Sequence, residues 1–365
     1  MRKLSDEEIS RKRGYQELAA QRNEMRCREP FLRYLFFELT MRCNERCLHC
    51  GSRCGDVKSE ELPLEVYQRI LDEVKAEFSP RLPQICITGG EPLLREDFFE
   101  ILSYARSLGF SWGMTSNGTL ITKEVAKKLA DAGMRTVSIS IDGLQAQNDM
   151  LRQTPGGYEK ALQGVKNLVE LQAFQHVQVT TVVHHQNIGD LPGLFDVLDG
   201  VDIDSWRIVN MEPIGRALRY PELMLTKADY KRLFTFIREM RENDYPVCYG
   251  CSHYLGAEME AEVRDWYFQC MAGTQVAGIM ANGDVGACLD IERRPETVQG
   301  NIYKERFTDI WRNRFSFFRQ DFSSKNEKCA ACPERRFCRG DSLHSWDFDK
   351  NEPMLCFRGT LWDEG

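Results

Sequence analysis

Short apolar runs with strand character alternate with amphipathic helical patterns between about residues 33 and 215. The strand-like runs cover residues 34–40, 84–90, 110–117, 136–142, 177–183 and 205–211. Helical periodicity appears between them, over residues 64–78, 95–108, 123–132, 158–172 and 189–198. Such alternation predicts an α/β fold of parallel βαβ units with right-handed crossovers. Because about six units are too few to close the usual eight-stranded barrel, we expect a partial (β/α)6 barrel.

The run at residues 136–142 separates its side chains by polarity. Because side chains alternate along a strand, apolar and small polar residues fall on opposite faces: Val137, Ile139 and Ile141 against Ser138, Ser140 and Asp142. Core strands of a nearly closed barrel normally carry apolar residues on both faces. The polar face therefore favours a ligand-filled interior, and the alternative is an edge strand with one wet face.

The alternation ends after a helical stretch near residues 225–243, and the pattern breaks at Pro246. Short strands, turns and cysteines replace it from there to the end. We therefore expect four parts: an N-terminal helical arm (1–32), the partial barrel (33–215), a bridging helix (216–245) and a small cysteine-rich domain (246–365). The arm alternates charges and lacks the apolar segment of a secretion signal, which indicates a solvated helix or a docking arm.

Charge and apolar content exclude several partners. The formal net charge of −7 gives no general attraction to nucleic acid or to anionic lipid. No apolar run approaches the roughly 20 residues that a membrane span needs. We place the protein in the cytoplasm. A chain of 365 residues there does not need disulfides, so its 14 cysteines favour ligation of metal by thiolates.

The first cysteine group is Cys43, Cys47 and Cys50, with C-x3-C-x2-C spacing directly after the first predicted strand. Three thiolates on one short loop can hold three irons of a four-iron cluster, which leaves one iron open. The alternative is a zinc site, but zinc sites generally use paired C-x2-C knuckles and four ligands. Cys54 lies close by, and we expect it to be a free thiol.

With this cysteine triplet, the sequence resembles the radical S-adenosylmethionine (radical SAM) superfamily over about residues 33–215. Gly89, Gly90, Glu91 and Pro92 resemble the motif that receives the methionine amino group. The resemblance implies further cofactor contacts along the later strands, from Ser116–Asn117–Gly118, Ser140, Asp142, Arg152, Met211 and Gly215–Arg216, and from His49 at a position that is usually aromatic.

By this resemblance, the open iron would chelate the amine and carboxylate of S-adenosylmethionine. One electron, from a donor such as flavodoxin or ferredoxin, would then cleave the sulfonium carbon–sulfur bond. The resulting deoxyadenosyl radical would take a hydrogen atom from the substrate. The cofactor carries the difficult chemistry, and the protein supplies placement and exclusion of water.

The later cysteines resemble those of a SPASM domain, which carries auxiliary iron–sulfur clusters. The resemblance implies a complete ligand set for one auxiliary cluster in Cys329, Cys332, Cys338 and Cys356. For another it implies Cys270 and Cys288, with Cys251 as the candidate for a third ligand. The family's fourth ligand would fall at Ser342, so Cys248 supplies the missing bond or one iron stays open. A zinc knuckle at Cys329–Cys338 is the alternative, because thiolate spacing alone does not separate zinc from iron.

Two residues have open roles in catalysis. Cys248 is either a ligand or an exposed thiol that donates a hydrogen atom to the substrate. Asp290, two residues after Cys288, lies near the place where some relatives carry a catalytic base, and the alternative is a solvated turn carboxylate.

The leading functional hypothesis is modification of a ribosomally made peptide, by a thioether, a carbon–carbon crosslink or epimerisation. The first ~32 residues are too few for a separate peptide-recognition domain, so leader recognition would use the arm, the barrel or a separate partner protein. One alternative is maturation of a whole protein, such as formylglycine formation on a sulfatase. Another is cofactor biosynthesis, including decarboxylation of haem precursors. A non-catalytic metal-binding protein is the alternative from a different class.

Overall fold

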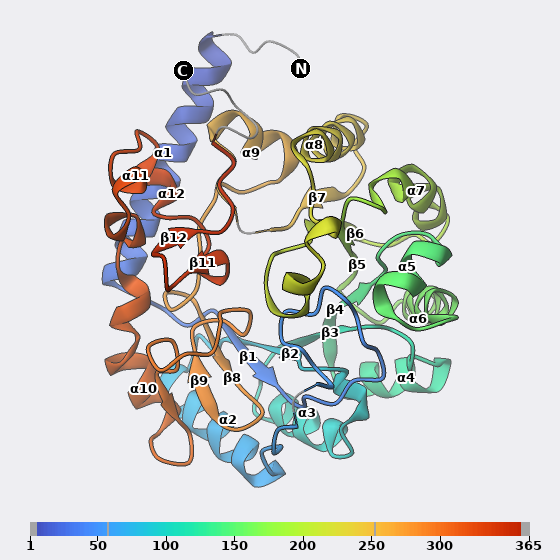
Figure 1. Cartoon of the computed structure of the whole chain (residues 1–365). Coiled ribbons are helices and arrows are strands. Elements are labelled where there is room, and N and C mark those ends of the chain that lie inside the picture. The colour runs from blue at the N-terminus through green and yellow to red at the C-terminus, as the bar shows by residue number, and fades with distance from the viewer. Residues whose placement is uncertain (1–5, 57, 252, 359–365) are drawn as a thin grey trace.

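The structure is a computed structural model that describes residues 6–56, 58–251 and 253–358 (Figure 1). Its strands are β1 (Tyr34–Glu38), β2 (Gln84–Thr88), β3 (Trp112–Ser116), β4 (Met134–Ser140), β5 (His176–Val183), β6 (Ser205–Asn210), β7 (Val247–Tyr249), β8 (Val276–Ile279), β9 (Asp284–Gly286), β10 (Gly300–Asn301), β11 (Trp346–Asp347) and β12 (Glu352–Pro353).

The helices lie mainly between consecutive strands. They are α1 (Asp6–Arg28), α2 (Leu64–Phe78), α3 (Phe98–Ser107), α4 (Lys123–Asp131), α5 (Gln145–Arg152), α6 (Gly157–Leu171), α7 (Leu191–Asp199), α8 (Lys227–Glu242), α9 (Ala257–Val263), α10 (Phe307–Asn313), α11 (Glu327–Ala330) and α12 (Arg335–Cys338). Their starts follow local chemistry: the Thr122 hydroxyl accepts a hydrogen bond from the N–H of Val125 at the start of α4, and Thr226 and Asp229 form a capping box on α8.

The expected α/β architecture is confirmed. Strands β1 to β6 pair in chain order, and all of these pairs are parallel. Helices cover the outer face of this sheet, as Figure 1 shows for α2, α3, α4, α6 and α7. The predicted helix over residues 64–78 coincides with α2, whose buried residues fall at helical spacing: Tyr67, Ile70, Leu71 and Val74.

The two faces of the sheet differ as the sequence predicts. From Thr136 onward in β4 and along all of β5, buried residues alternate with half-buried ones. The buried set faces the helices, because it shares one apolar core with the buried residues of α4 and α6. The inner set is polar, and Ser138 and Thr180 join neighbouring strands through their hydroxyls (2.7 Å). On β4 and β5, hydroxyl and amide groups therefore line much of the barrel interior, which suits a polar ligand.

The sheet continues beyond the six predicted units at both edges. Strand β7 adds to β6, and β8 adds to β1, both in parallel. Strands β9 and β10 then extend the β8 side, so the described residues form one ten-stranded sheet. The expected boundary at residues 245/246 is thus not a break in the sheet, because the following segment supplies both edge strands. The division into four parts stays a prediction.

Helix α1 lies against the C-terminal part of the chain (Figure 1). Lys12 pairs with Glu262 of α9 (3.2 Å). Arg336 of α12 pairs with Glu17 (2.7 Å) and Glu24 (3.0 Å) of α1. The N-terminal arm is therefore docked on its own chain rather than surrounded by solvent.

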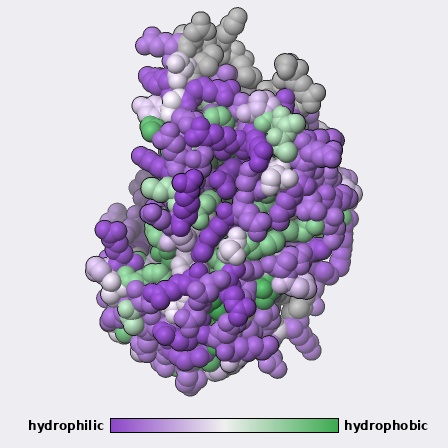
Figure 2. All heavy atoms as spheres, turned by 90° about the vertical axis from the view of Figure 1, so that its left-hand side faces the viewer, coloured by the Kyte–Doolittle hydropathy of each residue, from purple (hydrophilic) through white to green (hydrophobic). Residues whose placement is uncertain are grey.

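The surface on the α1 side is mainly hydrophilic. Figure 2 shows this face, where hydrophobic residues form small separate areas among hydrophilic ones. Within the described ranges, none of the helices combines the length and the apolar character needed to cross a membrane.

Candidate active site

The three cysteines of the C-x3-C-x2-C motif share one loop, residues 39–56, which follows the carboxyl end of β1 and is called the cysteine loop below. Cys47 is buried, and Cys43 and Cys50 are half-buried. Burial raises the pKa of Cys43 to about 11 and also raises the pKa of Cys47, because a desolvated thiolate is disfavoured. A bound metal reverses this effect, so buried thiols without disulfide partners suit an iron–sulfur cluster.

Cys54 lies beside this triplet, within the same loop. Its N–H donates to Sγ of Cys50 (3.4 Å), and its thiol donates to the carbonyl of Gly89 (3.4 Å). Hydrogen bonding by Cys54 lowers the pKa of Cys50 to about 6. Cys54 thus stabilises the thiolate of Cys50, while its own thiol is hydrogen-bonded to the Gly89 carbonyl.

A turn after β2 holds the cysteine loop from one side. The N–H of Gly90 donates to the carbonyl of Thr40 (2.7 Å), and the N–H of Glu91 donates to that of Arg42 (2.9 Å). If Gly89 carried a Cβ atom, that atom would lie only 2.5 Å from the carbonyl oxygen of Thr40. A Cβ on Gly90 would lie 2.0 Å from the carbonyl oxygen of Arg42. The absence of side chains at these glycines therefore lets the turn approach the cysteine loop closely.

The segment after β6 holds the loop from another side. Gly215 has a φ of +57°, and a Cβ there would lie 2.2 Å from the carbonyl oxygen of Gly51. The guanidinium of Arg216 donates to the carbonyls of Cys47 (2.8 Å) and Cys54 (3.0 Å). The match of Gly215–Arg216 to the family motif therefore has a physical reason, which is to fix the loop.

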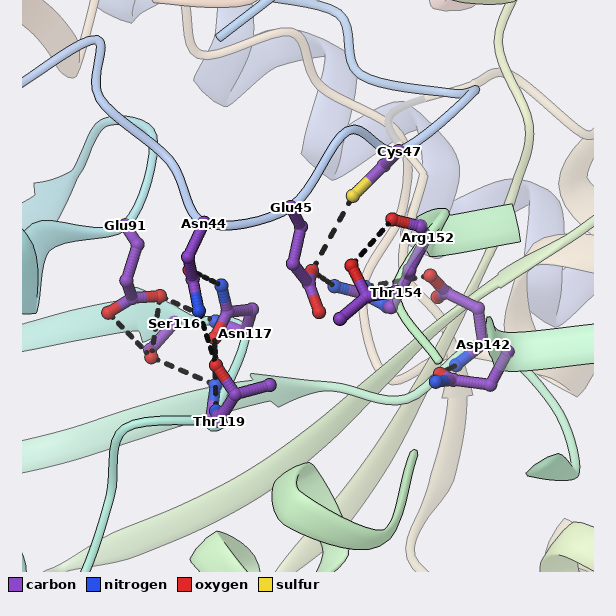
Figure 3. A network of polar contacts seen from close by, with 12 residues as sticks. Asn44, Glu45, Cys47, Glu91, Ser116, Asn117, Thr119, Asp142, Arg152 and Thr154 are labelled. Carbon is purple, nitrogen blue, oxygen red and sulfur yellow. Dashed lines mark hydrogen bonds and ion pairs between the residues drawn. The ribbon is translucent and has the colours of Figure 1, made fainter. Parts of the chain in front are cut away.

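Glu91 connects this turn to the end of β3 (Figure 3). Its carboxylate accepts hydrogen bonds from the Ser116 hydroxyl (2.9 Å) and from the N–H of Asn117 (2.9 Å). The Asn117 amide in turn donates to Asn44 of the cysteine loop (2.8 Å). Burial raises the pKa of Glu91 to about 7. Pro92 is buried and begins the short helical turn that follows. The expected contact of Glu91 with an ammonium group stays a prediction.

A buried ion triad joins the cysteine loop to β4 and α5 (Figure 3). Arg152 pairs with Glu45 (2.8 Å) and with Asp142 (2.7 Å), and all three side chains are at most 5% exposed. Asp142 also accepts a hydrogen bond from the N–H of Val182 (2.8 Å). His49 lies 3.7 Å from the same carboxylate. Two buried carboxylates thus already pair with the guanidinium of Arg152. Its expected contact with the cofactor stays a prediction.

Several polar atoms near this triad have no hydrogen-bond partner among the described residues. They are Nδ1 of His49, Oε1 of Glu45 and Nε2 of His184. Burial lowers the pKa of His49 to about 4, so its ring is neutral at pH 7. Buried polar atoms of this kind are costly unless a ligand satisfies them, which fits a polar cofactor. Ser140 is half-buried at the end of β4, and Met211 is buried in a small apolar cluster near the loop.

Reasoning from the sequence missed Glu45, Asn44 and the role of Arg216 in holding the loop. Glu45 and Asn44 lie inside the cysteine motif, between its first two cysteines. Their position inside the motif was the available signal. Glu45 is buried there, whereas Asn44 is exposed.

The second cysteine group comes together at the far end of the chain. Its four members line one cavity of about 50 Å³: Cys329, Cys332, Cys338 and Cys356. The guanidinium of Arg358 lies 3.2 Å from Sγ of Cys332. Four thiols around one cavity, with a cation beside them, fit the donor set of an iron–sulfur cluster. Their role as ligands stays a prediction.

Cys270 and Cys288 are half-buried. Burial raises the pKa of Cys288, and the nearby Cys270 raises it further. Ser342, at the position expected for a fourth ligand, is buried beside Cys270. Asp290 lies between this group and the cysteine loop, since its Oδ1 is 4.0 Å from the position of a Cβ on Gly51. The expected role of Asp290, as a catalytic base or a solvated turn carboxylate, stays a prediction.

Cys251 lies with Glu212 and His253, and their ligand atoms are all within 4.8 Å of one another. His253 is 2.6 Å from Glu212 and 2.5 Å from Asp341. Burial lowers the pKa of His253, but the two carboxylates outweigh burial and raise this pKa to about 10. Cys248 lies on β7. The expected ligation by Cys251 and the open role of Cys248 stay predictions.

Two family models match the chain. The radical SAM superfamily matches residues 37–198, and the SPASM iron–sulfur cluster-binding domain matches residues 270–333. The first range contains the cysteine loop and the glycine turn that holds it. The second begins at Cys270 and includes the first two cysteines of the C-terminal cavity.

Individual relatives match over most of their length. The AdoMet-dependent heme synthase of Methanosarcina barkeri is 29% identical over 348 residues, which are 89% of this chain and 97% of the relative. The mycofactocin maturase MftC of Mycobacterium ulcerans is 30% identical, over 85% of this chain and 82% of the relative. Streptococcus suis SuiB bound to the precursor peptide SuiA has the same fold, with a TM-score of 0.70 at 20% identity over 88% of this chain and 74% of SuiB.

The cysteine loop with its supports, the parallel sheet and these matches agree with one another. The cofactors that the superfamily and the domain imply are a four-iron cluster with S-adenosylmethionine and at least one further iron–sulfur cluster. The chain belongs to the radical SAM superfamily, carries a SPASM domain and is a radical SAM enzyme.

Proposed function

We propose that this enzyme acts on a haem precursor, an iron porphyrin with carboxylate side chains. The observation that carries the proposal is the match to an AdoMet-dependent heme synthase over 97% of that relative's length. Two more relatives with this name are 29% and 28% identical. The sequence alone favours peptide modification and leaves this function as an alternative, whereas these relatives favour it.

The residues around the cysteine loop would hold and orient the cofactor. Cys43, Cys47 and Cys50 would ligate the cluster, and the neutral ring of His49 would pack near the cofactor. When bound, the cluster and S-adenosylmethionine supply a deoxyadenosyl radical, which removes a hydrogen atom from the substrate. The glycine turn and Arg216 keep the loop in one place, which matters because a small misplacement of reacting atoms strongly reduces the rate.

The reaction balances as an oxidative decarboxylation. A propionate side chain loses one hydrogen atom to the radical and one electron to an acceptor. Carbon dioxide leaves, and a vinyl group remains. The cysteines of the C-terminal cavity would hold an iron–sulfur cluster that could accept this electron, because the potentials of such clusters span a wide range.

The test is anaerobic turnover of the reconstituted protein with S-adenosylmethionine, a strong reductant and Fe-coproporphyrin III, the iron porphyrin in the name of another relative that is 27% identical. We expect deoxyadenosine and a porphyrin that has lost carbon dioxide and two hydrogen atoms per reacting side chain. The Cys43→Ala variant is the control and should form neither product. Release of deoxyadenosine by the wild type with unchanged porphyrin would contradict the proposal.

Peptide modification is the second candidate. It is supported by the 30% identity to the maturase MftC and by the fold shared with SuiB, which binds a precursor peptide. Incubation with small peptides encoded next to the gene, with and without a separate leader-recognition protein, tests it. A mass change in such a peptide would favour this candidate over the porphyrin.

A further inference from the structure

Arg207 is a charged residue on the inner face of the barrel. It lies in the middle of β6, where its neighbours Trp206 and Ile208 are buried on the outer side. Because side chains alternate along a strand, Arg207 faces the interior. Arg207 is more exposed than the inward-facing residues of β4 and β5, which are half-buried. It also carries a charge, whereas those residues are uncharged.

The position of the Arg207 guanidinium is built into the local backbone. Its Nη2 donates to the carbonyl of Gly250 (2.8 Å), directly after β7. A Cβ at Gly250 would lie 2.2 Å from Nε of Arg207. Glycine at this position therefore leaves the space that the guanidinium occupies. Cys248 lies opposite Arg207 in the register of β6 and β7.

No carboxylate of the described residues forms an ion pair with Arg207. Among the inward-facing residues described for β1 to β7, Glu38 is the other one with a formal charge at pH 7, and it pairs with Arg293. The interior thus presents one cation whose charge is not balanced by a neighbouring carboxylate. Since a guanidinium binds carboxylates strongly and in a defined orientation, this cation is suited to an anionic ligand.

We infer that Arg207 binds a carboxylate of the substrate inside the barrel. This inference rests on the proposed function, in which that carboxylate is a propionate of an iron porphyrin. S-adenosylmethionine also has a carboxylate, but its predicted contacts lie at or beyond the carboxyl ends of the strands, from Glu91 after β2 to Met211 after β6. Arg207 lies instead within β6, before its carboxyl end.

The test measures binding separately from turnover. Fe-coproporphyrin III is titrated into the reconstituted protein without oxygen, and its visible absorption reports the bound fraction. We expect Arg207→Gln to weaken binding about tenfold or more, because a charge-assisted hydrogen bond is lost. Arg207→Lys keeps the charge and should recover part of the affinity. Arg135→Gln, which removes an exposed arginine at the start of β4, is the matched control and should bind as the wild type does.

The methyl ester of the same porphyrin sharpens the result. The wild type should bind the ester more weakly than the acid, and Arg207→Gln should discriminate less between them. The inference is overturned if Arg207→Gln binds the acid as tightly as the wild type does. It is also overturned if the substitution weakens the binding of S-adenosylmethionine instead. In both cases the proposed function stands. If the wild type does not bind the porphyrin, the proposed function fails and this inference falls with it.

Discussion

At the scale of single residues, the site depends on buried charges that neutralise one another. Glu45, Arg152 and Asp142 are nearly inaccessible to solvent and link the cysteine loop to β4 and α5. Burying a charge is costly unless a partner of opposite sign accompanies it. Arg152 compensates two carboxylates at once, so its loss leaves both of them unpaired.

We therefore expect Arg152→Met to lower the free energy of unfolding of the cluster-free protein by about 3–5 kcal/mol. Urea unfolding followed by circular dichroism measures this change. Lys123→Met is the matched control, because Lys123 pairs with Glu170 on the surface, where both side chains are about two-thirds exposed. That variant should lose less than about 1 kcal/mol. Equal losses in the two variants would contradict the importance of the buried triad.

His184 gives the protein a defined response to acid. It is fully buried, and burial lowers its pKa from 6.5 to about 4. As the pH falls below 6.5, the unfolded chain takes up a proton that the folded chain does not bind until about pH 4. The free energy of unfolding therefore decreases over this interval, by at most about 3 kcal/mol from this group.

Replacing His184 by asparagine removes the titrating group and keeps an acceptor for the N–H of Gln186, which now donates to Nδ1 of His184 (3.2 Å). The melting temperatures of both proteins, measured at pH 7 and at pH 4.5, check the prediction. We expect the wild type to lose more stability than His184→Asn between the two pH values. Parallel losses would show that other groups account for the acid response.

Single residues also show what the sequence can and cannot reveal. The spacing of Cys43, Cys47 and Cys50 indicates their chemistry directly, because few other functions require three thiols on one short loop. The partner of Glu45 lies 107 positions away, so no local pattern could connect them. The sequence likewise does not reveal a role for Arg207, because that role depends on which face of β6 the residue occupies.

At the scale of elements, two glycine-containing segments fix the cysteine loop. Gly215 combines a positive φ with a close approach to Gly51, so a side chain there would push the loop away. We expect Gly215→Ala to reduce the iron bound by the cysteine loop and to leave iron at the C-terminal cysteines. Electron paramagnetic resonance of the reduced protein, with and without S-adenosylmethionine, distinguishes the two sites.

Gly189→Ala is the control for this variant, because a Cβ at Gly189 would meet no atom within 4 Å. It should retain the signal that responds to S-adenosylmethionine. A Gly215→Ala protein that keeps the same signal at full intensity would show that the loop does not depend on this approach.

The elements themselves were largely predictable between residues 33 and 215, and α2 falls where its periodicity places it. Helix α5 was missed because its eight residues include few apolar ones. The sequence assigns β7 and β8, which flank the six barrel strands, to a separate part of the chain. Short strands show little alternation, and their partners are chosen by contacts with residues far away in sequence.

At the scale of the whole molecule, the cysteines divide into groups at separate places in the fold. The cysteine loop lies at the carboxyl end of the barrel strands, whereas the C-terminal cavity is built from α11, α12 and the segment that ends at Arg358. These sites should therefore load with iron independently of each other.

The prediction is that replacing Cys43, Cys47 and Cys50 by alanine removes about four iron atoms per chain. Replacing Cys329 and Cys332 should remove a further set of about four and leave the first. Iron and sulfide analysis of anaerobically reconstituted protein measures both. Cys86→Ala is the control, because Cys86 lies on β2 and belongs to neither group, and it should lose none. Zinc in place of iron at the C-terminal cavity would contradict the second expectation.

The pairing of β8 with β1 also has a consequence for biosynthesis. Strand β1 is among the first parts of the barrel to leave the ribosome. One of its edges stays unpaired until β8 is made, and β8 follows β1 to β7 in the chain. Until then, the nascent chain presents an open row of backbone groups next to apolar side chains, a template for aggregation. Slow translation between β7 and β8 should therefore lower the soluble yield, and a chaperone that shields this edge should restore it.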